Sequence, residues 1–145
     1  MNSVQWENLE THTLMNQLVA EPERMQEMLG KDFTPTVSVA AYLVSLLAKN
    51  HVNAQQVIAR SHLSKSFVYQ VLSGDRVPGR DVMLRIAFAL SLTLKETQRL
   101  LAIGHRPILY PKVSRDAALI CCICQKRSLE DTSEFLESIK ERPLL

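Results

Sequence analysis

Two stretches of the chain match each other when the sequence is shifted by 35 residues. Arg80-Asp81 falls on Arg115-Asp116 and Thr93-Leu94 falls on Ser128-Leu129, and no gap is needed over 22 positions. Each copy holds two segments of helical apolar periodicity separated by a Ser or Thr suited to cap a helix, which is the pattern of a helical hairpin. Two copies are fewer than the roughly three that a solenoid needs, so we expect one compact all-helical body.

The segments before the repeat carry helix start and stop signals of the same kind. Only four glycines occur in the 145 residues, which favours helices over turn-rich sheets. Asn53 and Ser64 are suitable N-caps, Thr93 and Glu96 have the spacing of a capping box, and Gly74 stands where a helix-ending glycine is expected. We therefore expect an all-α fold, with helices over residues 39–48, 54–61, 65–73, 80–90 and 94–103 before the second hairpin.

The charge of the chain is segregated along the sequence. The net charge is +2, but it is −4 over residues 1–34, +5 over 35–104, +4 over 105–127 and −3 over 128–145. We divide the chain into an acidic N-terminal helical segment (1–34), a domain (35–104) and a C-terminal helical hairpin packed on that domain (105–145). A basic centre between acidic ends is a sign asymmetry that bears on the choice of partner.

Several classes of function lack support in the sequence. The longest apolar run, residues 117–124, is far shorter than the roughly 18 residues that a membrane span needs, and no secretory signal opens the chain. The four histidines are scattered, with no nucleophile and carboxylate grouped around any of them, and no glycine-rich phosphate loop is present. We therefore expect no enzyme activity, no cofactor and no membrane association.

The cysteines form one short cluster, Cys121, Cys122 and Cys124. Their odd number and close spacing exclude a disulfide framework and fit a reducing, cytoplasmic location. No second cysteine pair and no histidine at ligand spacing accompany them, so we expect no metal site. The 35-residue shift lays them on Ile86, Ala87 and Ala89, which predicts three small buried apolar residues.

The helix expected over residues 80–90 is apolar almost all round, whereas a helix in a small domain needs only one apolar stripe. Its additional face must be covered by another part of the molecule. The C-terminal hairpin, the N-terminal segment and a second chain are the candidates.

Residues 57–74 have the pattern of two short helices joined by a turn of about three residues. Their sequence is Val-Ile-Ala-Arg-Ser-His-Leu-Ser-Lys-Ser-Phe-Val-Tyr-Gln-Val-Leu-Ser-Gly, and Pro78 and the run Met-Leu-Arg-Ile-Ala-Phe-Ala-Leu follow. This stretch resembles the phage-repressor (Cro-like, Xre-type) helix-turn-helix family, with similarity from Val39 to Leu101. The resemblance implies a five-helix repressor-like domain. His62 stands where the family has a turn glycine, and Ala54 stands where it commonly has a glutamine that grips a phosphate.

The resemblance implies a transcription regulator that binds double-stranded DNA sequence-specifically, with the recognition helix over residues 65–73 in the major groove. A homodimer is expected because one short helix reads few base pairs and two-fold proteins read two half-sites. Gln70 suits adenine, Lys65 suits guanine or a phosphate, and Ser66 suits either. The expected DNA-binding residues are Asn53, Gln55, Gln56, Ser64, Lys65, Ser66, Phe67, Tyr69, Gln70, Arg76 and Arg80.

Apart from Ser64, the expected set falls into three groups. Lys65 to Gln70 face the bases, Arg76 and Arg80 fix the phosphate register, and the polar side chains around residue 54 replace the missing glutamine. Two aromatic side chains and one cation make a weakly basic recognition face. A non-enzymatic adaptor or antitoxin-like module that holds a protein partner with the same face therefore remains the alternative.

Overall fold

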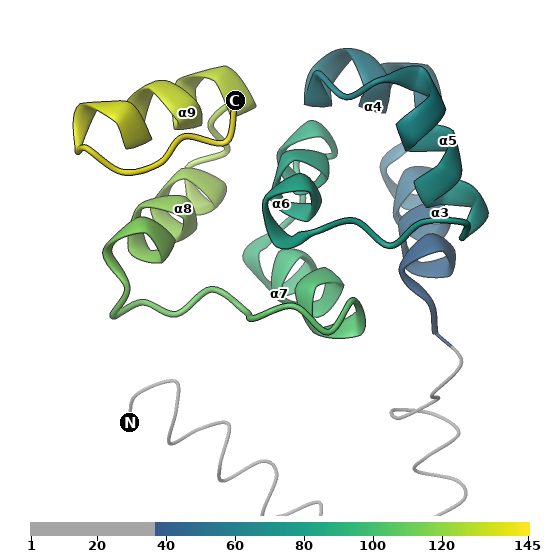
Figure 1. Cartoon of the computed structure of the whole chain (residues 1–145), viewed down its shortest axis with the longest axis horizontal. Coiled ribbons are helices and arrows are strands. Elements are labelled where there is room, and N and C mark those ends of the chain that lie inside the picture. The colour runs from purple at the N-terminus through teal and green to yellow at the C-terminus, as the bar shows by residue number, and fades with distance from the viewer. Residues whose placement is uncertain (1–36) are drawn as a thin grey trace, which may run out of the picture. The chain divides into compact units, whose positions relative to one another are not determined.

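The computed structural model describes residues 37–145, and these residues form seven α-helices without a β-strand (Figure 1). The helices are α3 (Val39–Asn50), α4 (Ala54–Ser61), α5 (Lys65–Ser73), α6 (Arg80–Ala89), α7 (Leu94–Ile103), α8 (Ser114–Cys124) and α9 (Leu129–Ser138). The all-helical prediction is confirmed for this part of the chain. The acidic helical segment predicted over residues 1–34 lies outside the described residues. None of the seven helices is long and apolar enough to cross a membrane.

Side-chain caps explain where most of these helices begin. The hydroxyl oxygen of Ser64 accepts from the Phe67 N–H at 3.2 Å at the start of α5. At the start of α7, Thr93 Oγ1 accepts from the Glu96 N–H at 3.1 Å, and Glu96 Oε1 accepts from the Thr93 N–H at 3.0 Å. Such reciprocal bonds satisfy backbone N–H groups that the first helical turn leaves without partners. The capping box predicted at Thr93 is confirmed.

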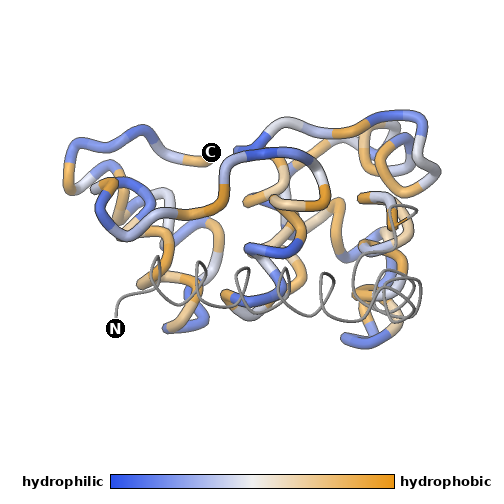
Figure 2. The backbone as a smooth tube through the Cα atoms, turned by 90° about the horizontal axis from the view of Figure 1, so that it is seen from below, coloured by the Kyte–Doolittle hydropathy of each residue, from blue (hydrophilic) through white to orange (hydrophobic). Residues whose placement is uncertain are grey.

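Helix α6 lies at the centre of the described residues and packs against α4, α7 and α9 (Figure 1). Its buried side chains leave little surface free, because Leu84 is fully buried and Met83 is 1% exposed. Hydrophobic and hydrophilic stretches alternate along the tube of the described residues in Figure 2, as in one-sided burial of helices. The apolar excess of α6 is thus covered from within residues 37–145, by α4 and the C-terminal hairpin.

The 35-residue repeat is present in the backbone. Helix α9 spans the residues that the shift derives from α7, and both helices follow a capping hydroxyl, of Thr93 and of Ser128. Left-handed backbone conformations recur at matching positions: Ser91 (φ 53°) with Lys126 (φ 57°), and His105 (φ 55°) with Lys140 (φ 61°). The prediction that the second hairpin resembles the first is therefore confirmed in backbone detail.

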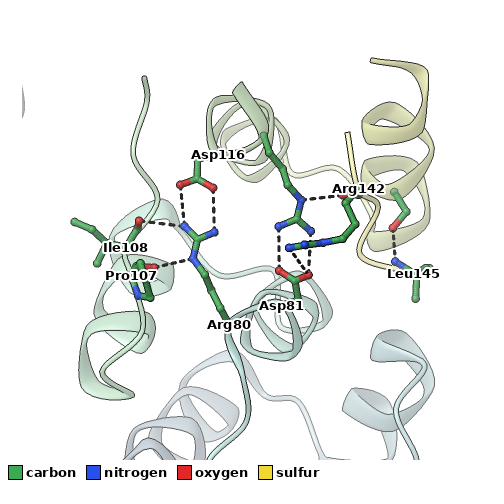
Figure 3. Close-up of polar contacts among 9 residues, drawn as sticks. Arg80, Asp81, Pro107, Ile108, Asp116, Arg142 and Leu145 are labelled. Carbon is green, nitrogen blue, oxygen red and sulfur yellow. Dashed lines mark hydrogen bonds and ion pairs between the residues drawn. The ribbon is translucent and has the colours of Figure 1, made fainter. Parts of the chain in front are cut away.

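The two hairpins, α6–α7 and α8–α9, exchange ion pairs at their first residues (Figure 3). Arg80 donates to both carboxylate oxygens of Asp116, at 3.0 and 2.8 Å. In return, Arg115 donates to both oxygens of Asp81, at 3.0 and 3.1 Å.

The helix contacts show the same exchange, because α6 packs on α9 while α7 packs on α8. If the repeats were related by translation, the first hairpin would contact the second through one surface and the second would contact the first through a different one. Here both hairpins use equivalent residues. The hairpins are therefore related by an approximate two-fold axis, which the sequence shift alone does not distinguish from translation.

Candidate functional site

The connection between α4 and α5 consists of His62, Leu63 and Ser64. His62 ends α4 in the left-handed conformation (φ 59°, ψ 25°), a backbone shape that glycine adopts without steric cost. His62, where the resemblance implies a turn glycine, thus adopts a conformation that permits a sharp turn at the end of α4. Helices α4 and α5 also contact each other directly, and α5 rests on α3.

Arg85 of α6 holds this connection from the inside. Its Nε and Nη2 atoms donate to the Ser61 carbonyl at 3.0 and 2.9 Å, and Nη2 also donates to the His62 carbonyl at 2.9 Å. These carbonyls end α4 and have no partner within the helix. The sequence reasoning missed this residue, although an arginine within an otherwise apolar helix is the signal that would have identified it.

Helix α5 divides into a buried side and an outward side. Val68 and Val71 are each 1% exposed and anchor the helix in the core. Lys65, Ser66 and Tyr69 are exposed on the outward side, and Tyr69 keeps 45% of its surface accessible. Among the described residues, the side chains of Lys65, Ser66 and Tyr69 have no hydrogen-bond or ion-pair partner. We call the predicted recognition residues of α5 its outward face: Lys65, Ser66, Phe67, Tyr69 and Gln70. Phe67 and Gln70 are half-buried, and Phe67 packs partly against the hydrophobic core.

Arg76 lies in the loop after α5 and folds back onto the helix. Its N–H donates to the Gln70 carbonyl at 3.2 Å, and its guanidinium carbon lies 5.2 Å from the centroid of the Phe67 ring. Stacking of this kind positions a guanidinium while leaving its N–H groups able to donate. The structure therefore brings Arg76 next to the outward face of α5.

The predicted polar residues near the start of α4 are partly engaged in capping. Asn53 Oδ1 accepts from the Gln56 N–H at 2.8 Å, and Gln56 Oε1 accepts from the Asn53 N–H at 3.0 Å. Their amide NH₂ groups remain available as donors, and Gln55 is exposed. The Ser64 hydroxyl is likewise an N-cap, so its oxygen is already an acceptor for α5.

Arg80, predicted to contact a phosphate, does not lie free at the surface. In addition to its ion pair with Asp116, it donates from Nε to the Pro107 carbonyl at 2.8 Å and from Nη2 to the Ile108 carbonyl at 3.1 Å (Figure 3). All three guanidinium nitrogens are used within the chain, and its side chain is 22% exposed. Arg80 thus joins the two hairpins, and the free guanidinium that the predicted phosphate contact needs is taken up by these partners.

Much of the basic excess of the chain is used in the same structural way. Arg85 and Arg106 donate to backbone carbonyls, Arg115 pairs with Asp81, and Lys49 pairs with Glu96 at 3.0 Å. Near the outward face of α5, the cations are Lys65 and Arg76, with Asp75 beside them in sequence. The net charges summed over residues 35–104 and 105–127 therefore overstate the positive charge that an external partner can contact.

The cysteine cluster differs from the prediction. Cys122 is buried, 1% exposed, and burial raises the pKa of its thiol. Cys121 and Cys124 are exposed, so the prediction of three buried residues is wrong for two of them. The equivalents of these two in α6, Ile86 and Ala89, are each 2% exposed because α6 has α4 beside it. Within residues 37–145 no group of three or more His, Cys, Asp or Glu side chains is placed to hold a metal ion.

Comparison with known proteins adds no relative to this description. No family model, no curated protein and no solved structure matches the chain.

Proposed function

We propose that the chain is a transcription regulator that binds double-stranded DNA sequence-specifically, with α5 in the major groove. The observation that carries this proposal is the outward face of α5, which offers donors without internal partners on a helix whose opposite side is anchored by Val68 and Val71. A helix held in this way presents its side chains to base edges with little loss of conformational entropy on binding. The proposal treats α3 to α7 as a repressor-like five-helix domain.

The outward face of α5 contains the chemistry that base recognition needs. Gln70 pairs with adenine through its amide, and Lys65 donates to guanine acceptors or to a phosphate. Ser66 bonds to either kind of base edge, while the Phe67 and Tyr69 rings suit the thymine methyl group. Lys65, the nearby Arg76 and two aromatic rings predict a modest electrostatic contribution and a larger share from base contacts.

Phosphate contacts are assigned to groups that lack a full set of internal partners. Arg76, stacked on Phe67, is the side-chain candidate beside α5. Helix α6 begins after Gly79 without a side-chain cap, so its first N–H groups form a second candidate. The amide groups of Asn53, Gln55 and Gln56 form a third, at the start of α4.

The decisive experiment is a titration of the full chain into labelled genomic fragments at several salt concentrations. We expect preferred fragments and a negative slope of log K against log salt, because each phosphate contact releases counterions. Lys65→Glu is expected to weaken binding, whereas Lys95→Glu, the same charge change on α7, is the control and is expected to have a much smaller effect. Absence of a preferred fragment together with a slope near zero would refute the proposal.

A test at single base positions distinguishes sequence-specific recognition from non-specific electrostatic binding to DNA. Gln70→Ala is expected to cost about 1–3 kcal/mol at one base position of the selected site while non-specific affinity stays the same. Equal affinity of wild type and Gln70→Ala across all base substitutions would remove Gln70 from the recognition set.

A second candidate function is an adaptor that holds a protein partner with the same face. The observation in its favour is the combination of an exposed Tyr69 with only two nearby cations, one of which is already stacked on Phe67. Aromatic anchors of this kind are typical of protein interfaces. A partner retained by Lys65→Glu with Arg76→Glu but lost with Tyr69→Ala would support the adaptor over DNA binding.

A further inference from the structure

The approximate two-fold axis pairs each position of α6 with one of α8. Comparing the neighbours of the two helices shows which side of α8 lacks a packed helix. Helix α6 is packed against α4, α7 and α9. Helix α8 is packed against α7 and α9, and among the described residues no helix takes the place that α4 has on α6. The exposure of Cys121 and Cys124, whose equivalents Ile86 and Ala89 are buried, marks this uncovered side.

We call this side the α8 face and define it by the exposed Cys121 and Cys124 and the half-buried Ala117 and Ile120, of which Ile120 packs partly against the core. From Ala117 to Gln125 the helix and its end carry no charged residue. The charged pair of α8, Arg115 and Asp116, is buried and turned toward α6.

The loop that leads into α8 extends this apolar surface. Ile108, Tyr110 and Val113 are large apolar side chains that are 36%, 38% and 48% exposed. These exposed apolar side chains, which have the exposed Lys112 among them, add to the apolar character of the region before α8. Exposed apolar surface of this kind marks a protein contact.

We propose that the α8 face is covered by the α8 face of a second copy of the chain, around a two-fold axis. The α4–α6 contact shows that a surface of this shape accepts a helix. In an isologous pair each copy supplies that helix to the other, so both apolar faces are covered and neither is left over.

The composition of the face supports a second copy over a charged partner. Because no charged side chain lies on it, two identical faces meet without opposing like charges, and an acidic or basic partner finds no complement. The small side chains of Ala117 and Cys121 allow two helices to approach closely.

The position of α8 is compatible with a dimer in which both α5 helices stay free. In Figure 1, α6 lies between α8 and α5, so a contact through α8 does not have to involve α5. The inference concerns assembly and does not depend on DNA binding, and its test contains no DNA, so either proposal can fail alone.

The first test is the mass of the full chain by sedimentation velocity over a range of concentrations. A dimer is expected, and Cys121→Glu is expected to weaken self-association by about tenfold or more, since the new carboxylates would face each other in an apolar contact. Ala102→Glu, a change of the same charge at an exposed position of α7, is the control and should leave the dimer intact.

The second test uses the natural thiols and needs no destabilising substitution. Mild oxidation is expected to join two chains through Cys121 or Cys124, and the double variant Cys121→Ser with Cys124→Ser should abolish this band on a non-reducing gel. Cys122→Ser should retain it, because Cys122 is buried.

Three results would overturn the inference. One is a monomer in which Cys121 and Cys124 react with an alkylating reagent, which would mean that the α8 face is exposed to solvent. Another is a monomer whose two thiols resist alkylation, which means that another part of the chain covers the face. The third is a dimer that is indifferent to Cys121→Glu and gives no disulfide through these thiols, which places the dimer contact elsewhere.

Discussion

The guanidinium of Arg80 and the carboxylate of Asp116 form a two-point ion pair, with Nη1–Oδ1 and Nη2–Oδ2 distances of 3.0 and 2.8 Å. Asp116 is 4% exposed and also accepts from the Tyr110 N–H at 3.0 Å. The pair therefore joins α6, α8 and the loop between the hairpins at one buried point. Its counterpart, Arg115 with Asp81, closes the same junction from the other side.

Removing one partner of this pair should destabilise the fold strongly. Arg80→Met is expected to cost about 3 kcal/mol of unfolding free energy, because the Asp116 carboxylate would remain buried without its cation. Arg80→Met combined with Asp116→Asn should cost less than the sum of the two single changes, as expected for contacting partners. Urea denaturation of the four proteins measures this coupling, and strict additivity would show that the pair does not act as a unit.

Stability should fall at acid pH in a way that depends on Asp116. Burial by itself raises the pKa of Asp116, but hydrogen bonds from Arg80 and the Tyr110 N–H, with the Arg80 charge, outweigh it and leave the pKa below its ordinary value. The unfolded chain therefore binds the proton more readily, so this contribution is present above about pH 4 and is lost as pH falls through the folded-state pKa.

Unfolding free energies measured from pH 6 to acid test this sign. Asp116→Asn should give a flatter pH dependence below about pH 4 than the wild type. Glu137→Gln, at an exposed position of α9, serves as the control for loss of a carboxylate. An unchanged slope in Asp116→Asn would contradict the prediction.

Arg85 should be needed to hold the connection between α4 and α5. Arg85→Met removes the donors to the Ser61 and His62 carbonyls and is expected to cost about 1–3 kcal/mol, because the part-buried Ser61 carbonyl would lose its partner. Amide hydrogen exchange should increase in α4 and the following turn before it does in α7. Arg60→Met is the control, because the Arg60 Nη1 atom lies 3.4 Å from the Ala89 carbonyl, a long contact, and should cost less.

Gly104 should not accept a side chain. A Cβ atom at this position would overlap the end of the Met83 side chain and approach Val39 Cγ2 closely, although the backbone itself is unstrained (φ −81°). Gly104→Ala is therefore expected to cost about 1–3 kcal/mol through overpacking. Gly79→Ala is the matched control, since no atom lies within 4 Å of its added Cβ, and it should be neutral or slightly stabilising. Thermal denaturation of both variants distinguishes the steric overlap at residue 104 from the general effect of replacing a glycine by alanine.

The helices were largely predictable because their signals are local. Asn53, Ser64 and Thr93 each cap a helix at the predicted residue, and Gly74 ends α5 with φ 90°. Apolar periodicity likewise identified Val68 and Val71 as the anchored side of α5 and left Lys65 and Tyr69 outside. The 35-residue repeat survives in the backbone because matching caps and turn residues impose matching dihedral angles.

The site was less predictable because the availability of a side chain depends on distant partners. The sequence shows that Arg76 and Arg80 are both cations near α5, yet only the tertiary structure stacks Arg76 on Phe67 and binds Arg80 to Asp116, 36 residues away. Cys121 and Ile86 hold equivalent positions in the repeat. Packing against α4 buries Ile86, whereas Cys121 is exposed. Local sequence thus determined the helices and their repeat. The two-fold arrangement, the free cations and the uncovered α8 face were decided by contacts between segments far apart in the chain, because charge pairing and burial depend on distance in space.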